Sequence, residues 1–187
     1  LAFMNRSHNA IDSINCIEKA KEIGFNNITI DLIYGLPKQD LTSWEKNLNI
    51  LFGLNIQHFS AYCLTIENKT ALHRLVKKKE IIPLDDEKKI EQYYMLYDMA
   101  YANKFIQYEI SNFGKENFFS KHNIGYWKNQ NYIGVGPSAH SYNGNNRRWN
   151  ISSNKKYINN IINKKCYYTN EELSLKDKYN EYIFVSL

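Results

Sequence analysis

Asp31 is the residue whose type and position most clearly indicate a ligand site in this sequence. It interrupts residues 27–33, a run otherwise rich in apolar and β-branched residues, as a buried parallel strand is. A buried carboxylate is costly unless it is paired or binds a ligand. The run ends at Gly35-Leu36-Pro37, and α/β barrels bind ligands at the carboxyl ends of their strands. Asp31 is therefore a candidate ligand-binding residue; the alternative is a structural ion pair or a helix cap.

Arg6 and Thr65 are candidates for the same kind of site. Arg6 follows what could be an earlier strand, and its guanidinium offers a planar fork to a carboxylate. Thr65 ends a second apolar run, residues 57–64, where a strand tip could touch a ligand. An arginine and an aspartate from neighbouring β/α loops suit a zwitterionic ligand, the arginine at its carboxylate and the aspartate at hydroxyls or an ammonium. The alternative for Arg6 is a surface position at a helix N-terminus.

The most unusual stretch runs from His122 to His140 and combines two histidines with several glycines and clustered aromatic residues. Its candidate binding residues are His122, Asn123, Tyr126, Trp127 and His140. Glycines let the backbone approach a ligand closely, imidazole can ligate iron, and aromatic rings can flank a flat macrocycle. The alternative is that the histidines only tie down a long loop by hydrogen bonds.

Hydrophobic periodicity and breaker residues predict the elements that position these candidates. Helix, strand, helix and strand alternate with short links at the start of the chain, which predicts an α/β protein with parallel strands. Residues 42–45 read as a capping box that opens the second helix. Residues 112–130 and 134–146 read as loops. The expected helices cover residues 9–23, 42–53, 70–79, 85–103, 154–163 and 174–187, and the expected strands cover 27–33, 57–64 and 105–111.

The composition, 43% hydrophobic and 23% charged, is that of a globular protein. No apolar run approaches the roughly 20 residues that cross a bilayer. The net charge is +5, but the basic residues are scattered, so no nucleic acid is expected as a partner. Cys16, Cys63 and Cys166 lie far apart and show no metal-ligand spacing, and no signal peptide is recognisable. These features predict a cytoplasmic protein.

The segments together resemble one family. FMNRSHN, IDLIYGLPKQ, AYCLTIENKT, QYEISNF, HNIGYW and YIGVGPSAHS follow one another as in the radical S-adenosylmethionine proteins related to oxygen-independent coproporphyrinogen III oxidase. The resemblance is greatest to the HemW branch, the heme chaperones, and covers nearly the whole chain. It implies that residues 1–150 are the carboxyl-terminal part of a partial (β/α)6 TIM-like barrel with a heme-associated loop region. Residues 151–187 would begin a smaller, mainly helical domain.

The resemblance also implies cofactors. The family binds S-adenosylmethionine at the open iron of a [4Fe-4S] cluster held by a CxxxCxxC motif, and this chain contains no such motif. The chain alone is therefore not expected to assemble the cluster or to cleave S-adenosylmethionine, and no catalytic residue is assigned to it. Arg6 matches the arginine that faces S-adenosylmethionine, Asp31 matches an acid that contacts the same ligand, and Thr65 is expected to touch it.

For heme, the resemblance points to the HNxxYW segment, here His122, Asn123, Tyr126 and Trp127, with His122 as first candidate axial ligand and His140 as second. The function implied is a chaperone that binds heme and delivers it to other proteins, possible acceptors being respiratory proteins. The enzyme that converts coproporphyrinogen III to protoporphyrinogen IX is the alternative, and a basic binding module without catalysis is a third. A homodimer and membrane association through partners are further expectations.

Overall fold

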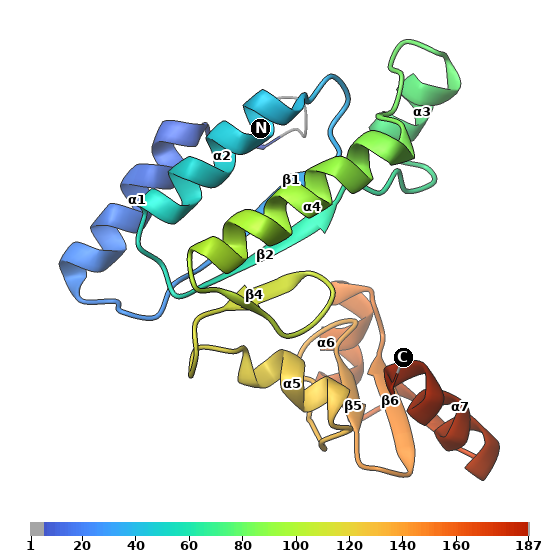
Figure 1. Cartoon of the computed structure of the whole chain (residues 1–187). Coiled ribbons are helices and arrows are strands. Elements are labelled where there is room, and N and C mark those ends of the chain that lie inside the picture. The colour runs from blue at the N-terminus through green and yellow to red at the C-terminus, as the bar shows by residue number, and fades with distance from the viewer. Residues whose placement is uncertain (1–5, 187) are drawn as a thin grey trace. The chain divides into compact units, whose positions relative to one another are not determined.

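The chain forms two compact units, residues 1–119 and 120–187, in the computed structural model, which describes residues 6–186 (Figure 1). Residue 150, where the sequence suggests a domain boundary, ends a strand inside the second unit. The domain boundary near that residue stays a prediction about the protein as a whole.

The first unit is a layer of helices on a four-stranded sheet with the strand order β1-β2-β4-β3. The two long strands, β1 and β2, are parallel, and the short β4 is antiparallel to both β2 and β3. The expected alternation of helices and parallel strands is confirmed for the first half of the unit. The elements are α1 (Ala10–Ile23), β1 (Thr29–Tyr34), α2 (Leu41–Gly53), β2 (His58–Cys63), α3 (Ala71–Lys77), α4 (Asp86–Ala102), β3 (Ile106–Gln107) and β4 (Asn112–Gly114).

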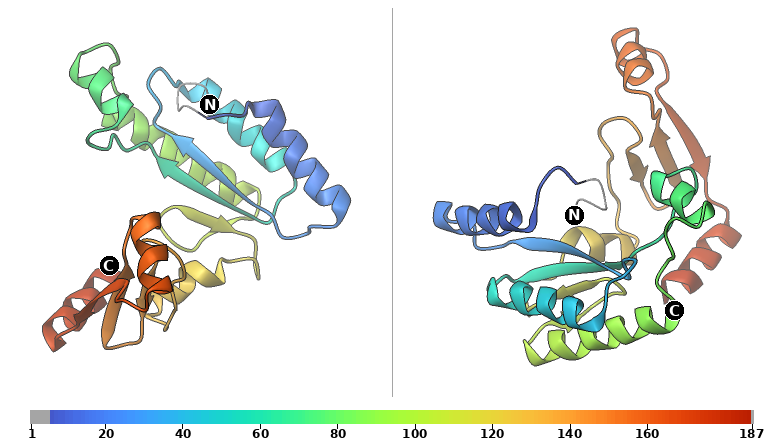
Figure 2. Two further views of the ribbon diagram at one scale, coloured as in Figure 1. Left: turned by 180° about the vertical axis from the view of Figure 1, so that it is seen from behind. Right: turned by 90° about the horizontal axis from the view of Figure 1, so that it is seen from above.

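The core lies between one face of this sheet and the helices α2 and α4, which run side by side (Figure 2). Strand alternation sends every second side chain of β2 into this core, namely Phe59 and Ala61. Phe59 stacks on Phe113 of β4 with the ring centroids 4.8 Å apart. Trp44 of α2 and Leu96 of α4 are fully buried in the same core.

The third expected strand, residues 105–111, is wrong in its extent. A turn divides this segment, so that β3 pairs with β4 as an antiparallel hairpin. Polar side chains close the turn: the Glu109 carboxylate accepts the Ser111 N–H (3.2 Å), and the Gln107 amide donates to the carbonyl of Ile110 (2.9 Å). The helix cap expected at residues 42–45 is also displaced, because Asp40 caps α2 by accepting the Ser43 N–H (2.8 Å).

Helix α4 buries a polar residue where an apolar face is expected. Its buried residues are Gln92, Leu96 and Ala100, whereas Ile90 and Tyr94 are exposed. The Gln92 side chain accepts the N–H of Gly35 (2.8 Å) and donates to the carbonyl of Gln39 (3.0 Å). It thereby fixes the loop that follows β1.

Replacing Gln92 with leucine is expected to lower the free energy of unfolding by about 2 kcal/mol, because two backbone groups lose their buried partner. Urea denaturation followed by circular dichroism measures this loss. Glu91→Leu is the matched control, since Glu91 is exposed on the same helix, and it is expected to change the free energy by less than about 0.5 kcal/mol. Equal effects of the two substitutions would contradict the conclusion that Gln92 stabilises the loop after β1.

The second unit combines a three-stranded antiparallel sheet of order β5-β6-β7 with three helices. The two expected carboxyl-terminal helices are confirmed as α6 and α7, and a strand that the sequence did not predict, β7, lies between them. Helix α5 and the hairpin β5–β6 form where loops are expected. No helix among residues 6–186 has the length and apolar character to span a membrane. The elements are α5 (Lys121–Trp127), β5 (His140–Tyr142), β6 (Asn146–Asn150), α6 (Asn154–Ile162), β7 (Tyr168–Glu172) and α7 (Leu175–Ser186).

Candidate functional site

The sheet face opposite the α2–α4 core is polar and carries Asp31. Asp31 lies in register with Ser60 of β2, which lies in register with Asn112 of β4. The Ser60 hydroxyl donates to the side-chain oxygen of Asn112 (2.6 Å), and both of these residues are buried. Asp31 itself is exposed, because β1 lies at one edge of the described sheet. Its carboxylate forms no ion pair with another described residue, so it is free to meet a ligand on this face.

His58 is buried on the same polar face, in register with Thr29, which lies two residues before Asp31 on β1. The ring nitrogens of His58 hydrogen-bond Thr29 Oγ1 (2.6 Å) and the hydroxyl of Tyr108 (2.7 Å). The Tyr108 ring in turn stacks on Phe119 with the centroids 4.6 Å apart. Burial lowers the pKa of His58, and the nearby negative charge of Asp31 opposes that shift only in part. His58 is therefore held in its neutral form.

The free energy of unfolding is expected to fall as the pH drops below about 6.5, the ordinary pKa of histidine. Because the pKa of His58 is lower in the folded than in the unfolded chain, the unfolded chain binds the extra proton in that range. The stabilisation is complete above the unfolded pKa and is lost as the pH falls toward the folded one. Urea titrations at several pH values measure the slope. The His58→Gln variant is expected to have a smaller slope, and an unchanged slope would contradict this assignment.

A pocket of about 430 Å³ lies at the carboxyl ends of β1 and β2, and Thr65 contributes to its wall together with Gly35, Cys63, Asp86 and Lys89. Gly35 has a positive φ of 75° that suits glycine. Lys89 Nζ lies 2.8 Å from an Asp86 carboxylate oxygen, and this contact raises the pKa of Lys89. The wall of this pocket therefore carries a charged pair, Asp86 and Lys89, close to the ends of the two strands.

Arg6 lies just before α1, which begins at Ala10 and is capped by Asn9. Helix α1 runs back along β1 (Figure 1), so its start lies at the end of the sheet where β1 finishes. Arg6 is exposed and makes no ion pair with Asp31 among the described residues. The start of α1 and the Thr65 pocket thus lie at the same end of the sheet, while Asp31 lies on the polar face.

The HNxxYW segment is helical, not a loop. Ser120 caps α5 by accepting the N–H of Asn123 (3.3 Å), which places His122 and Tyr126 one turn apart. Their rings meet edge to face with the centroids 4.8 Å apart. His122, Tyr126 and Trp127 are exposed, and Asn123 is half-buried. Three of the four candidate residues thus lie open to solvent on one short helix.

Tyr126 continues into a line of aromatic rings that we call the aromatic row: His122, Tyr126, Tyr132 and Tyr142. Tyr126 meets Tyr132 at 4.8 Å, and Tyr132 meets Tyr142 at 6.0 Å. Burial and the nearby Tyr126 raise the pKa of Tyr132 above the ordinary tyrosine value. Of this row, the sequence indicated His122 and Tyr126 as candidate binding residues but not Tyr132 or Tyr142; a high tyrosine content was the available signal.

Arg147 places a positive charge beside the aromatic row. Its guanidinium lies 6.0 Å from the centroid of the Tyr142 ring and 2.9 Å from a carboxylate oxygen of Glu181. In the β5–β6 pairing, Arg147 lies directly opposite Tyr142. A cation at this position could meet an anionic group on a ligand that covers the row.

His140 lies two residues before Tyr142 on β5, so both side chains leave the same face of the strand. It packs beside Trp149 at 6.2 Å and lines a pocket of about 350 Å³ with Trp149, Ser138 and Thr169. Neither His122 nor His140 hydrogen-bonds its imidazole to another described residue. The alternative that these two rings only tie down a loop therefore lacks support.

The described residues do not provide a cluster site. Residues 6–186 hold no group of three His, Cys, Asp or Glu side chains that could hold a metal ion. Cys16, Cys63 and Cys166 are each exposed, on α1, on β2 and just before β7. The ligand set that the resemblance requires for a [4Fe-4S] cluster does not match these cysteines.

Two curated relatives match this chain along 98% of its length. The chain is 37% identical over 185 residues to "Heme chaperone HemW" of Bacillus subtilis (strain 168). It is 32% identical over 185 residues to "Heme chaperone HemW" of Lactococcus lactis subsp. lactis (strain IL1403). The chain covers 49% and 48% of these proteins, so it spans about half of their length. No family model matches the chain.

A solved structure shares the fold. The coproporphyrinogen III oxidase (HemN) from Escherichia coli, described as a radical SAM enzyme, superposes with a TM-score of 0.78 at 20% identity. The match covers 98% of this chain and 45% of that one. The α/β fold expected from the motifs, that of the coproporphyrinogen III oxidase, is thereby confirmed. The resemblance to the HemW and coproporphyrinogen oxidase-like proteins is confirmed as well.

Proposed function

We propose that this chain is the heme-binding part of a heme chaperone of the radical S-adenosylmethionine class. The observation that carries the proposal is the aromatic row of the second unit. Its first member, His122, is exposed, and its imidazole forms no hydrogen bond with another described residue. The sequence similarity to proteins named heme chaperones supports the same function.

Heme would supply two features: an iron that accepts an axial imidazole, and a macrocycle with a flat apolar face. In this proposal His122 provides the imidazole, with His140 as the second candidate, and Tyr126 and Trp127 cover the macrocycle. Asn123, half-buried beside His122, would hold the segment in place. Arg147 offers its charge to the propionates.

Absorption titration of the 187-residue chain with hemin tests this proposal. The expected result is a saturable Soret shift at one hemin per chain that apomyoglobin, a competing heme acceptor, reverses. A linear, non-saturating absorbance increase would show only nonspecific uptake and would contradict the proposal.

S-adenosylmethionine is the second ligand of the proposed function, bound in the intact protein with a [4Fe-4S] cluster whose ligands lie outside this chain. Arg6 would meet its carboxylate, Asp31 its ribose hydroxyls, and Thr65 would touch it at the strand end. These roles are supported by the exposure of Asp31 and Arg6 and by the position of Thr65 in the pocket at the carboxyl ends of β1 and β2.

Asp31→Asn in the intact protein is expected to weaken S-adenosylmethionine binding about tenfold, because hydrogen bonds to a charged group are worth about 1.5–3 kcal/mol. Equilibrium dialysis with labelled S-adenosylmethionine measures the change. Asp98→Asn is the matched control, since Asp98 is an exposed carboxylate of α4. Unchanged binding in Asp31→Asn would remove Asp31 from the site.

The second candidate function is the oxidation of coproporphyrinogen III to protoporphyrinogen IX. The shared fold with the coproporphyrinogen III oxidase from Escherichia coli favours it. Identity to that protein is 20%, against 37% to the Bacillus subtilis relative, which favours the chaperone. The heme-accepting proteins, the homodimer and the cytoplasmic location expected from the sequence stay predictions.

A further inference from the structure

An ion pair between Arg147 of β6 and Glu181 of α7 lies at the aromatic row. The guanidinium and the carboxylate are 2.9 Å apart, and the two side chains are 33% and 31% exposed. Ion pairs with this much exposure contribute little to stability, because water screens them. A second contact ties α7 to the turn between β5 and β6, since Lys178 Nζ donates to the side-chain oxygen of Asn145 (2.7 Å). The helix therefore keeps a contact with the hairpin when the ion pair opens.

The same arginine contacts the aromatic row. Its guanidinium lies 6.0 Å from the centroid of the Tyr142 ring and hydrogen-bonds Tyr132, the next ring of the row. A guanidinium presents its N–H donors in a planar fork that matches a carboxylate. The carboxylate of Glu181 and a carboxylate on a ligand that covers the row would therefore bind the same group.

We propose that Glu181 competes with the carboxylates of the ligand for Arg147 and thereby promotes release of the ligand. This inference rests on the proposed function, in which the ligand is heme and its carboxylates are the propionates. Without ligand, Glu181 neutralises Arg147. A propionate replaces Glu181 on binding, and the Glu181 carboxylate turns to solvent. Because one carboxylate is exchanged for another, the ion pair with Glu181 re-forms as the ligand leaves, which favours transfer to an acceptor.

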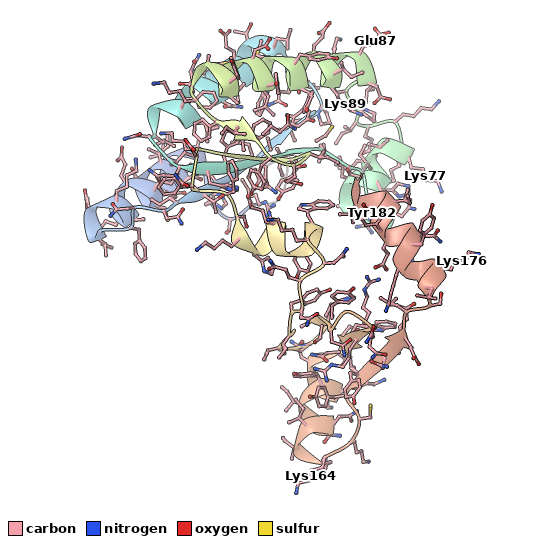
Figure 3. All side chains as sticks on the ribbon, turned by 60° about the horizontal axis from the view of Figure 1, so that its bottom comes forward. Lys77, Glu87, Lys89, Lys164, Lys176 and Tyr182 are labelled. Atoms are coloured by element: carbon pink, nitrogen blue, oxygen red, sulfur yellow. The ribbon has the colours of Figure 1, made fainter. Side chains whose placement is uncertain are left out.

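A second acid on the same sheet provides a comparison. Glu171 of β7 lies in register with Arg147 and is exposed, yet among residues 6–186 the ion pair of Arg147 is with Glu181. Glu181 comes from helix α7, on which Figure 3 labels Lys176, near the start, and Tyr182, the neighbour of Glu181. Removal of either acid changes the net charge equally, but only Glu181 contacts the guanidinium. Glu171→Gln is therefore the matched control for Glu181→Gln.

Titration of the 187-residue chain with hemin and with hemin dimethyl ester, whose propionates carry no charge, tests the competition. Glu181→Gln is expected to tighten hemin binding about threefold to fivefold, the factor that a partly exposed ion pair contributes. Transfer of hemin to apomyoglobin is expected to slow by a similar factor. The affinity for the ester is expected to stay unchanged, because the ester cannot replace Glu181 at the guanidinium. Glu171→Gln is expected to leave both affinities unchanged.

A double variant and a folding control complete the test. When Arg147→Gln is already present, Glu181→Gln is expected to have no further effect on hemin binding, and circular dichroism checks that every variant is folded. Equal tightening for hemin and its ester, or equal effects of Glu181→Gln and Glu171→Gln, would overturn the proposal. Hemin binding that Glu181→Gln leaves unchanged or weakens would overturn this inference alone. Absence of hemin binding by the unaltered chain would overturn the proposed function together with it.

Discussion

Replacing Phe59 with alanine is expected to lower the free energy of unfolding of the first unit by about 3–5 kcal/mol. Phe59 has no exposed surface, and β2, which carries it, lies between β1 and β4. Its ring lies 4.8 Å from that of Phe113, 5.1 Å from that of Phe105 and 5.9 Å from that of Phe52. Alanine would leave a cavity that these three neighbouring rings cannot fill.

Urea denaturation monitored by far-ultraviolet circular dichroism measures the effect. Tyr101→Ala serves as the control, since Tyr101 is a large aromatic residue that is 76% exposed, and it is expected to change the free energy by less than about 0.5 kcal/mol. A loss below about 1 kcal/mol for Phe59→Ala would mean that the aromatic core does not hold the sheet to its helices.

Replacing His122 with alanine is expected to weaken hemin binding about a hundredfold and to change the Soret band, because the iron loses its proposed axial ligand. His122 is exposed and its ring lies against Tyr126 at 4.8 Å, so its removal should leave the helix folded. His140→Ala is expected to have a smaller effect. His140 lies beside Trp149 and its own pocket and not at the exposed start of the aromatic row.

His8→Ala and His73→Ala provide matched controls, since both histidines belong to the first unit. They are expected to leave both the affinity and the spectrum unchanged. If His140→Ala proves the more damaging variant, His140 replaces His122 as ligand. If neither variant alters the spectrum, the aromatic row binds no iron through these histidines.

Helices with strong local end signals were predictable from the sequence. Helix α1 begins after Asn9, which forms a reciprocal capping box with Asp12, and ends at Gly24, which adopts a left-handed conformation. Strands β1 and β2 were predictable because their β-branched and aromatic residues lie between clear breakers. These signals act within a few residues, so tertiary structure was not needed to recognise them.

The second unit was less predictable because its elements are short. Helix α5 has seven residues and contains a glycine, so no periodicity could reveal it. Asn143-Gly144 read as a loop, although such a pair is a strong hairpin signal. In the structure the Asn143 side chain accepts the N–H groups of Asn145 (3.1 Å) and Asn146 (2.7 Å) and turns β5 into β6.

The candidate site was predictable in its residue types but not in its arrangement. The sequence marked Asp31 as buried, whereas it is exposed because β1 lies at an edge of the described sheet. It marked His122 and His140, but Tyr132 and Tyr142, which extend the ring contacts of Tyr126, come from separate segments that only folding brings together. Gln92 was overlooked because a polar residue on a helix normally faces water.

The most direct test of the proposed function compares two reactions of the intact protein that contains this chain. Purified protein is supplied with S-adenosylmethionine and a reductant, and either hemin or coproporphyrinogen III is added. Hemin is expected to remain bound as an intact complex and to pass to an apoprotein acceptor, while coproporphyrinogen III is expected to be recovered unchanged. Formation of protoporphyrinogen IX, with no retention of hemin, would contradict the account and identify the protein as the oxidase.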